Sequence, residues 1–107
     1  MQEEEVMTIG SDNVFADIGH PHPEEALAKA KLIYRITTVI KSRGLTQIDA
    51  AKLLGISPDK FSSIADGELL DEVTIGQLTD YLTALDEDIE IIVRHAQGPA
   101  QLHVTLG

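Results

Sequence analysis

The sequence contains no cysteine and no tryptophan, and only two tyrosines and two phenylalanines among its 107 residues. Without cysteine the chain forms no disulfide and has no thiolate nucleophile. No apolar run approaches the roughly 18 residues that a membrane-spanning helix needs. The acidic beginning, MQEEEV, also lacks the basic and apolar regions of a secretory signal. These absences favour a cytoplasmic protein that is not inserted in a membrane and whose core is aliphatic.

Basic residues are also scarce, and they are unevenly distributed. The formal net charge is -10, but residues 1–25 carry -7, residues 26–65 carry +5 and residues 66–107 carry -8. Charges further apart than about 8 Å are largely screened at physiological salt. The local charge of the central block therefore matters more than the total, and a polyanionic partner is not excluded. The seven basic residues of this block could contact phosphate groups, namely Lys29, Lys31, Arg35, Lys41, Arg43, Lys52 and Lys60. The alternative is that their side chains form an ordinary solvated surface.

Signatures of catalysis and of metal binding are missing from the sequence. It has no nucleophile in a recognisable frame with a base, no glycine-rich phosphate loop and no HExxH motif. The four histidines are better explained as linker and strand residues than as metal ligands, because their spacing is not that of a ligand set. The sequence therefore predicts neither an enzyme nor a bound cofactor or metal ion.

Periodic apolar residues and capping residues predict four helices in a domain over residues 23–86. They are expected over 23–43, 46–55 and 57–67, with a fourth that begins at Thr74 and continues through Leu85. The main apolar stripe of the first helix is expected at Leu27, Ala30, Tyr34, Thr37 and either Ile40 or Lys41. Further apolar residues widen that stripe, namely Leu32, Ile33, Ile36 and Val39.

The stretch TQIDAAKLLGISPDKFSSIADGE, from Thr46 to Glu68, has the spacing of a helix-turn-helix. Ala51 stands where two steeply crossing helices need a small side chain, and Gly55 stands where the first helix must end. Ile56, Phe61 and Ile64 fall where the second helix must face the core. The offsets predict a helix-turn-helix over 46–67. The alternative is two ordinary antiparallel helices joined by a glycine turn.

The two ends of the chain differ from its helical middle. Residues 1–22 are expected to form an acidic, partly flexible arm in which Val14, Phe15 and Ile18 dock. Near the other end, β-branched residues at 89–93 and alternation over 101–106 flank a Gln-Gly-Pro turn. They predict a β-hairpin within a region, 87–107, that serves dimerisation; the alternative is a hairpin that packs only on its own core. The expected fold class is mainly α, a bundle of four to five helices with a C-terminal β-hairpin.

A resemblance to known proteins supports this interpretation. Residues 46–67 resemble the phage-repressor-like helix-turn-helix proteins, the XRE or Cro/CI type. The segments NVFADIG, EEALAKAKLIYRI, GLTQIDAAKLLGIS and LTALDEDIEIIVR, within roughly residues 11–95, are similar to HigA-like antitoxins of type II toxin–antitoxin pairs. The resemblance implies a lambda-repressor-like homodimer that binds an operator in double-stranded DNA and represses its own operon. It also implies a small mRNA-cleaving ribonuclease toxin as partner.

The resemblance assigns DNA contacts to the two helices of the motif. In such motifs the N-terminal residues of the second helix reach base edges in the major groove. The expected DNA-binding residues are Thr46, Gln47, Ser57, Pro58, Asp59, Lys60, Ser62 and Ser63. Pro58, Asp59 and Ser63 take the base-reading positions, and Thr46 and Gln47 lie near phosphate. Lys60 is the residue suited to a strong guanine contact.

The same positions support a second hypothesis. Pro58 has no side-chain donor, Asp59 only accepts hydrogen bonds, and the motif is followed by the acidic Asp66-Gly67-Glu68. The chain could therefore be a protein-interaction module that keeps the helix-turn-helix shape without reading DNA. In that case the acidic arm would cover the positive surface of a basic toxin.

Overall fold

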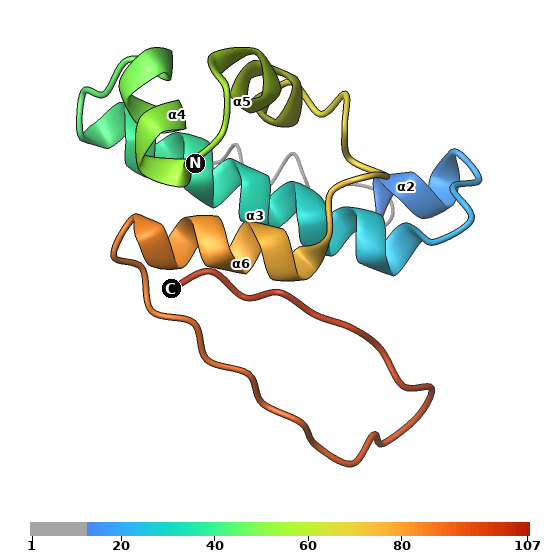
Figure 1. Ribbon diagram of the computed structural model, residues 1–107. Coiled ribbons are helices and arrows are strands. Elements are labelled where there is room, and N and C mark those ends of the chain that lie inside the picture. Colours follow the sequence, from blue (N-terminus) through green and yellow to red (C-terminus); the bar gives the residue numbers. More distant parts are fainter. Residues whose placement is uncertain (1–12) are drawn as a thin grey trace.

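The computed structural model describes residues 13–107, and this range forms five α-helices and no β-strand. The helices are α2 (Val14–Asp17), α3 (Pro23–Ser42), α4 (Gln47–Leu54), α5 (Pro58–Ala65) and α6 (Ile75–Ala84). The long helix α3 runs through the middle of the molecule, with α4 and α5 above it, α6 alongside it and α2 at its N-terminal end (Figure 1). The four predicted helices are therefore confirmed. None of the described helices is both long and apolar enough to cross a membrane.

Short polar side chains fix where α4, α5 and α6 begin. Thr46 and Ser57 each accept a hydrogen bond at 3.1 Å from the backbone N–H of the third residue of the helix that follows. Thr74 accepts from the N–H of Gln77 at 3.0 Å, and the Gln77 side chain accepts from the N–H of Thr74 at 2.9 Å. The first N–H groups of a helix have no partner within the helix, so these bonds stabilise the helix starts.

The core lies between α3 and the shorter helices. The buried apolar side chains of α3 are Ala26, Ala28, Leu32, Ile33, Ile36, Val39 and Ile40. Ile36 is 1% exposed and belongs to the same cluster as Phe61, Leu78 and Leu82. The stripe expected on this helix was centred wrongly, because Tyr34 is 64% exposed. Apolar residues occupy several faces of α3, and the helices packed against it select the face that is buried.

Residues 13–22 lead into α3, whereas residues 1–12 of the expected acidic arm lie outside the described residues. The Asn13 side chain caps α2 by accepting from the N–H of Phe15 at 2.9 Å. Phe15 is half-buried, and its ring meets that of His20 edge-on with centroids 5.9 Å apart. Val14 and Ile18 are mostly exposed. Of the three apolar residues expected to dock, only Phe15 does so in the described chain.

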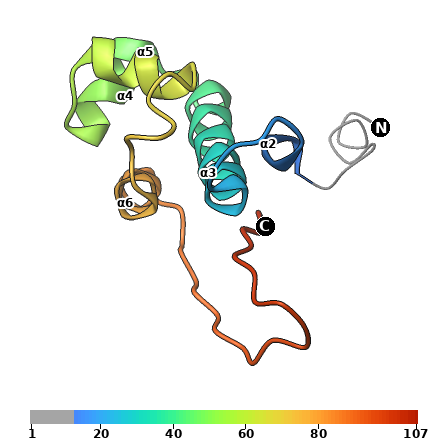
Figure 2. The same ribbon diagram turned by 90° about the vertical axis from the view of Figure 1, so that its right-hand side faces the viewer.

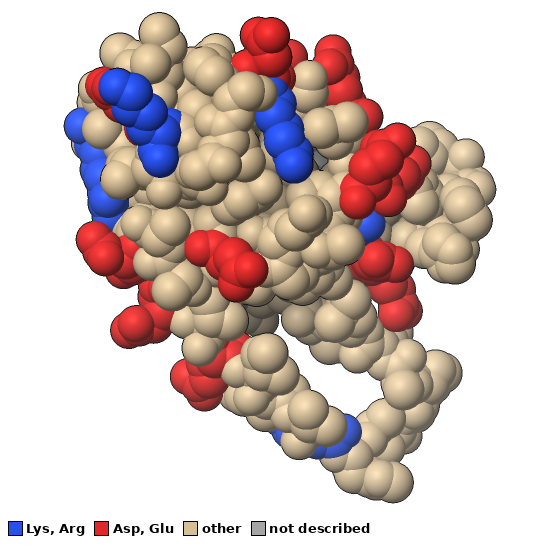
Figure 3. Space-filling model, in the orientation of Figure 1, with Lys and Arg blue, Asp and Glu red and all other residues tan. Residues whose placement is uncertain are grey.

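The β-hairpin expected within residues 87–107 is wrong, because no strand forms in this part of the described chain. Residues 87–107 leave α6, run outward and return as an open loop below the helices (Figures 1 and 2). The space-filling view leaves a clear gap between the two legs of this loop (Figure 3).

Contacts with α3 explain why the two legs stay apart. The backbone N–H of Leu102 donates to Glu24 at 3.3 Å, and Lys31 donates to the carbonyl oxygen of Val104 at 3.2 Å. Among the described residues, no backbone hydrogen bond joins the two legs. A hairpin requires such bonds, and the returning leg is instead held against the helix.

Two glycines give a test of the backbone conformations in this fold. Gly55 ends α4 in the left-handed region, at φ 75° and ψ 30°, whereas Gly76 lies inside α6. A side chain added at either glycine has room, so only the backbone preference should matter. We expect Gly55→Ala to lower the free energy of unfolding by about 1 kcal/mol. We expect Gly76→Ala to raise it by roughly 0.5 kcal/mol.

Urea unfolding followed by circular dichroism measures both glycine variants. Equal effects of the two substitutions would contradict the left-handed C-cap at Gly55, since Gly55 has a positive φ and Gly76 does not.

Candidate nucleic-acid interface

The helices α4 and α5 are joined by a three-residue turn and pack on each other. Ala50 and Ala51 are 0% and 1% exposed, so their small side chains permit a close approach. Phe61 and Ile64, on the inner face of α5, are also buried. Gly55 has the left-handed conformation expected at the end of the first helix. The buried Ala51, Phe61 and Ile64 and the partly buried Ile56 also lie as predicted for a helix-turn-helix.

The eight residues predicted to contact DNA lie on the first turns of α4 and α5 and on the next turn of α5. Six of them are exposed, namely Thr46, Gln47, Ser57, Pro58, Asp59 and Lys60, and two are half-buried, namely Ser62 and Ser63. The oxygens of Thr46 and Ser57 already accept the capping hydrogen bonds of their helices. Their O–H groups can still donate, which leaves them suited to a phosphate oxygen.

Lys and Arg are visible over α4, α5 and the neighbouring end of α3, whereas Asp and Glu extend along α6 and toward α2 (Figure 3). Acidic residues also follow α5 directly. Four of them are exposed between α5 and α6, namely Asp66, Glu68, Asp71 and Glu72. Most of the positive charge on this face therefore lies over the helix-turn-helix and the neighbouring end of α3 (Figure 3).

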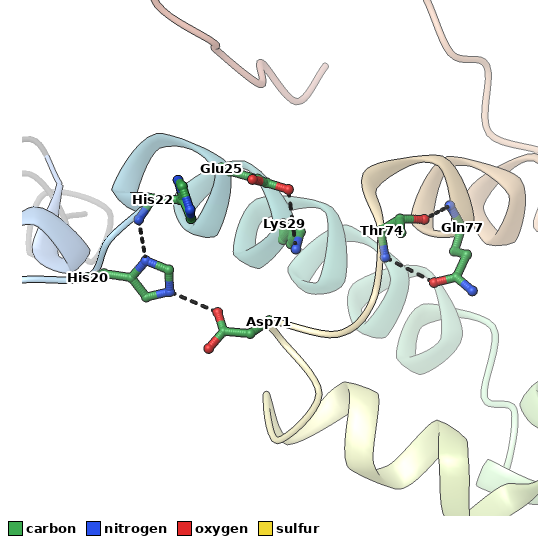
Figure 4. A network of polar contacts seen from close by, with 7 residues as sticks. All are labelled: His20, His22, Glu25, Lys29, Asp71, Thr74 and Gln77. Carbon is green, nitrogen blue, oxygen red and sulfur yellow. Dashed lines mark hydrogen bonds and ion pairs between the residues drawn. The ribbon is translucent and has the colours of Figure 1, made fainter.

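Several basic residues of the central block are engaged inside the protein. The Lys29 side chain is 8% exposed, and its Nζ lies 3.4 Å from a Glu25 oxygen (Figure 4). Lys31 is half-buried and donates to the Val104 carbonyl oxygen. Both lysines are thereby removed from the surface that a nucleic acid would meet.

The two arginines of the block are engaged in the same way. Arg35 forms an ion pair with Glu87 at 2.9 Å and also donates to the Gly107 carbonyl oxygen. Arg43 donates to the carbonyl oxygen of Leu85, at the end of α6. These bonds hold the chain that follows α6 against α3, so the arginines are structural residues.

Three lysines remain for an external partner. Lys41, Lys52 and Lys60 are exposed, and none of them forms an ion pair with the described residues. The sequence pattern gave all seven basic residues of the block as possible phosphate contacts. No local signal separates the exposed lysines from Lys31, Arg35 and Arg43, because the partners of these three residues lie far away along the chain. Lys29 differs, since its partner Glu25 is only four residues away.

The histidines of the N-terminal linker form a polar network with Asp71. His20 Nε2 lies 2.8 Å from Asp71 Oδ1, and His20 Nδ1 accepts the backbone N–H of His22 at 2.9 Å (Figure 4). Nδ1 is therefore the acceptor, and the proton on Nε2 points to Asp71. Over residues 13–107, no three His, Asp or Glu side chains gather as metal ligands would.

Comparisons with known proteins agree with this geometry. The family model of the "Helix-turn-helix domain" matches residues 14–94. A solved structure described as "Putative XRE Family Transcriptional Regulator" is 32% identical, with a TM-score of 0.72, over 78% of this chain and 97% of that chain. No match is found among curated proteins.

The fold and the site together define a helix-turn-helix protein. Since the family model covers most of the chain and the solved relative is similar over nearly its whole length, the chain belongs to the XRE-type helix-turn-helix family.

The division of the lysines can be tested by limited acetylation with acetic anhydride. We expect Lys41, Lys52 and Lys60 to react fastest, and Lys29 to react several-fold more slowly because its amine is buried beside Glu25. Mass spectrometry of peptides, sampled over time, measures the rate at each lysine. Equal rates at Lys29 and Lys52 in the native protein would contradict the burial described above, and the urea-unfolded protein is the control.

Proposed function

We propose that this protein is a DNA-binding transcriptional regulator that acts as a homodimer. The observation that carries the proposal is the exposed N-terminal turn of α5 in a helix-turn-helix of the XRE type. This turn presents Lys60, which has no ion-pair partner among residues 13–107. The solved relative, which is itself described as a transcriptional regulator, supports the same function.

In this proposal each element of the motif has a role in DNA binding. Helix α5 enters the major groove with its N-terminal end toward the bases. Lys60 donates to the O6 and N7 acceptors of guanine, and Asp59 accepts from the amino group of cytosine. Thr46 and Gln47, at the start of α4, donate to phosphate oxygens and fix the position of the motif on the duplex. Two such motifs in a homodimer read two half-sites about one helical turn apart.

The few available lysines limit the electrostatic part of the binding. Lys41, Lys52 and Lys60 provide three positive charges in each protomer, and therefore six in a dimer. Each neutralised phosphate contributes about -0.9 to the slope of log K against log salt, so we expect a slope of about -5 for the dimer. Fluorescence anisotropy on DNA from upstream of the protein's own gene, at several salt concentrations, measures it. Absence of binding at low salt would contradict the proposal.

The base contact has a separate test. We expect Lys60→Ala to weaken binding to the operator by about 1–3 kcal/mol and to relax the preference for operator over scrambled DNA. Lys52→Ala is the matched control, because it removes one exposed positive charge outside the N-terminal turn of α5 and should weaken binding to operator and scrambled DNA alike. The same anisotropy titration measures both variants. An equal loss for the two variants would show that Lys60 contributes only charge.

We propose in addition that the protein is the antitoxin of a type II toxin–antitoxin pair and neutralises a small mRNA-cleaving ribonuclease. The resemblance to HigA-like antitoxins over roughly residues 11–95 supports this role. The charge of -7 over residues 1–25 also supports it, because an enzyme that cuts RNA presents a positive surface that an acidic segment complements.

Charge removal in the N-terminal segment tests the toxin contact. We expect the triple substitution of Glu3, Glu4 and Glu5 by Gln to weaken binding to the ribonuclease encoded beside this gene by at least about tenfold. Isothermal titration calorimetry measures the affinity. The matched control is the substitution of Asp66, Glu68 and Glu72 by Asn or Gln, which removes equal charge near α5. Unchanged affinity in the first variant would exclude the acidic arm as the toxin contact.

A further inference from the structure

Residues 88–95, directly after α6, have a surface that is unusual for a folded monomer. All eight are exposed, and Ile91, Ile92 and Val93 are 82%, 61% and 90% exposed. The chain here forms neither helix nor strand and runs outward from α6 as a drawn-out trace (Figure 1), and none of its backbone N–H or C=O groups bonds to another backbone group among residues 13–107. An extended segment of β-branched residues with a free backbone is a template for pairing with another strand.

The order of residues in this segment makes it complementary to itself. If two copies pair antiparallel about Ile92, the residue at position 90 stands opposite position 94 of the other copy. Glu90 then meets Arg94 twice, once at each end of the pair. Neither side chain has an ion pair within residues 13–107. Directly opposite side chains of opposite charge stabilise a strand pair.

The same alignment brings three apolar side chains of each copy together on one face of the strand pair. Ile91 stands opposite Val93 of the other copy, and Ile89 lies on the same face because side chains alternate along a strand. On the second face Ile92 stands opposite its own counterpart, between the two Glu90–Arg94 pairs. A two-fold interface uses the same patch on both subunits, so that patch must be complementary to itself. A segment that pairs with a different protein needs no such self-complementarity.

We infer that residues 89–95 form an intermolecular antiparallel strand pair with the same segment of a second copy of this chain, aligned at Ile92. The inference deepens the proposed function, since it rests on the homodimer named there and specifies the surface that forms it.

The way in which the segment is attached favours this pairing. Arg43 and Arg35 hold the chain at Leu85 and Glu87, before the segment. Lys31 holds the returning leg at Val104. The loop that contains the segment is thus held at both of its ends, at Glu87 and at Val104. It has lost part of its conformational freedom before it binds, so less is lost on pairing.

Charge reversal tests the alignment. We expect Glu90→Arg and Arg94→Glu, each alone, to raise the dimer dissociation constant at least about tenfold, because each places like charges opposite each other at both ends. The Glu90→Arg/Arg94→Glu double variant should dimerise like the wild type. An equimolar mixture of the two single variants should form heterodimers. Sedimentation equilibrium of the full chain measures all four, and circular dichroism confirms the fold of each variant.

Single cysteines give a second test, which is simple because the natural chain has none. We expect Ile92→Cys to form a disulfide-linked dimer on mild oxidation, because residue 92 faces itself across the pair. Ile91→Cys should cross-link poorly alone and well when mixed with Val93→Cys. Non-reducing electrophoresis measures the yield.

Several outcomes would overturn the inference. A monomeric wild type at working concentration would mean that the segment packs on its own chain or binds another protein. Dimers unaffected by either charge reversal would place the interface elsewhere. These assays contain no DNA, so a protein that dimerises in this way but fails to bind its upstream DNA would refute the proposed function and leave the strand pair standing.

Discussion

The apolar face of α3 holds the other helices in their places, because α5 and α6 pack directly against it and α4 packs on α5 and α6. Ile36 lies near the middle of this face and is almost completely buried. The exposed end of α5 can be presented at a fixed angle only while that face stays covered. The orientation of the helix-turn-helix is thus a property of the whole domain, although its sequence signature is local.

The same packing determines which positive charges remain available on the surface. The basic residues on the inner and lower sides of α3 bind carboxylates and carbonyl oxygens within the protein, as Arg35 does with Glu87. Partly buried charges need such partners, and the consequence is that the helix-turn-helix keeps few cations for DNA. A formal charge of +5 over residues 26–65 therefore overstates the positive surface that a nucleic acid would meet.

Features that depend on neighbouring residues were predictable from the sequence, and features that depend on distant residues were not. The caps at Thr46, Ser57 and Thr74 and the left-handed Gly55 each involve a few adjacent positions, so the helix boundaries and the exposed turns of the candidate site could be predicted. The burial of one face of α3 rather than the face of Tyr34 depends on α5 and α6, which no local pattern specifies.

The expected hairpin does not form, for a related physical reason. Residues 89–93 and 101–106 have the composition of strands, but composition does not choose a pairing partner. The returning leg finds donors and acceptors on α3, including Lys31, and these contacts keep the legs apart. Which of the seven basic residues stay available at the candidate site was unpredictable on the same grounds, since their partners are as distant as Glu87 and Val104.

The open loop after α6 also bears on how long the protein survives. Every residue from 88 to 103 is exposed and lies in neither helix nor strand, and exposed loops of this kind are preferred sites of proteolytic cleavage. A partner that covers this loop makes it inaccessible to proteases. Turnover of the protein would then depend on its concentration and on its binding partners, because the fraction of uncovered loops sets the rate of cleavage.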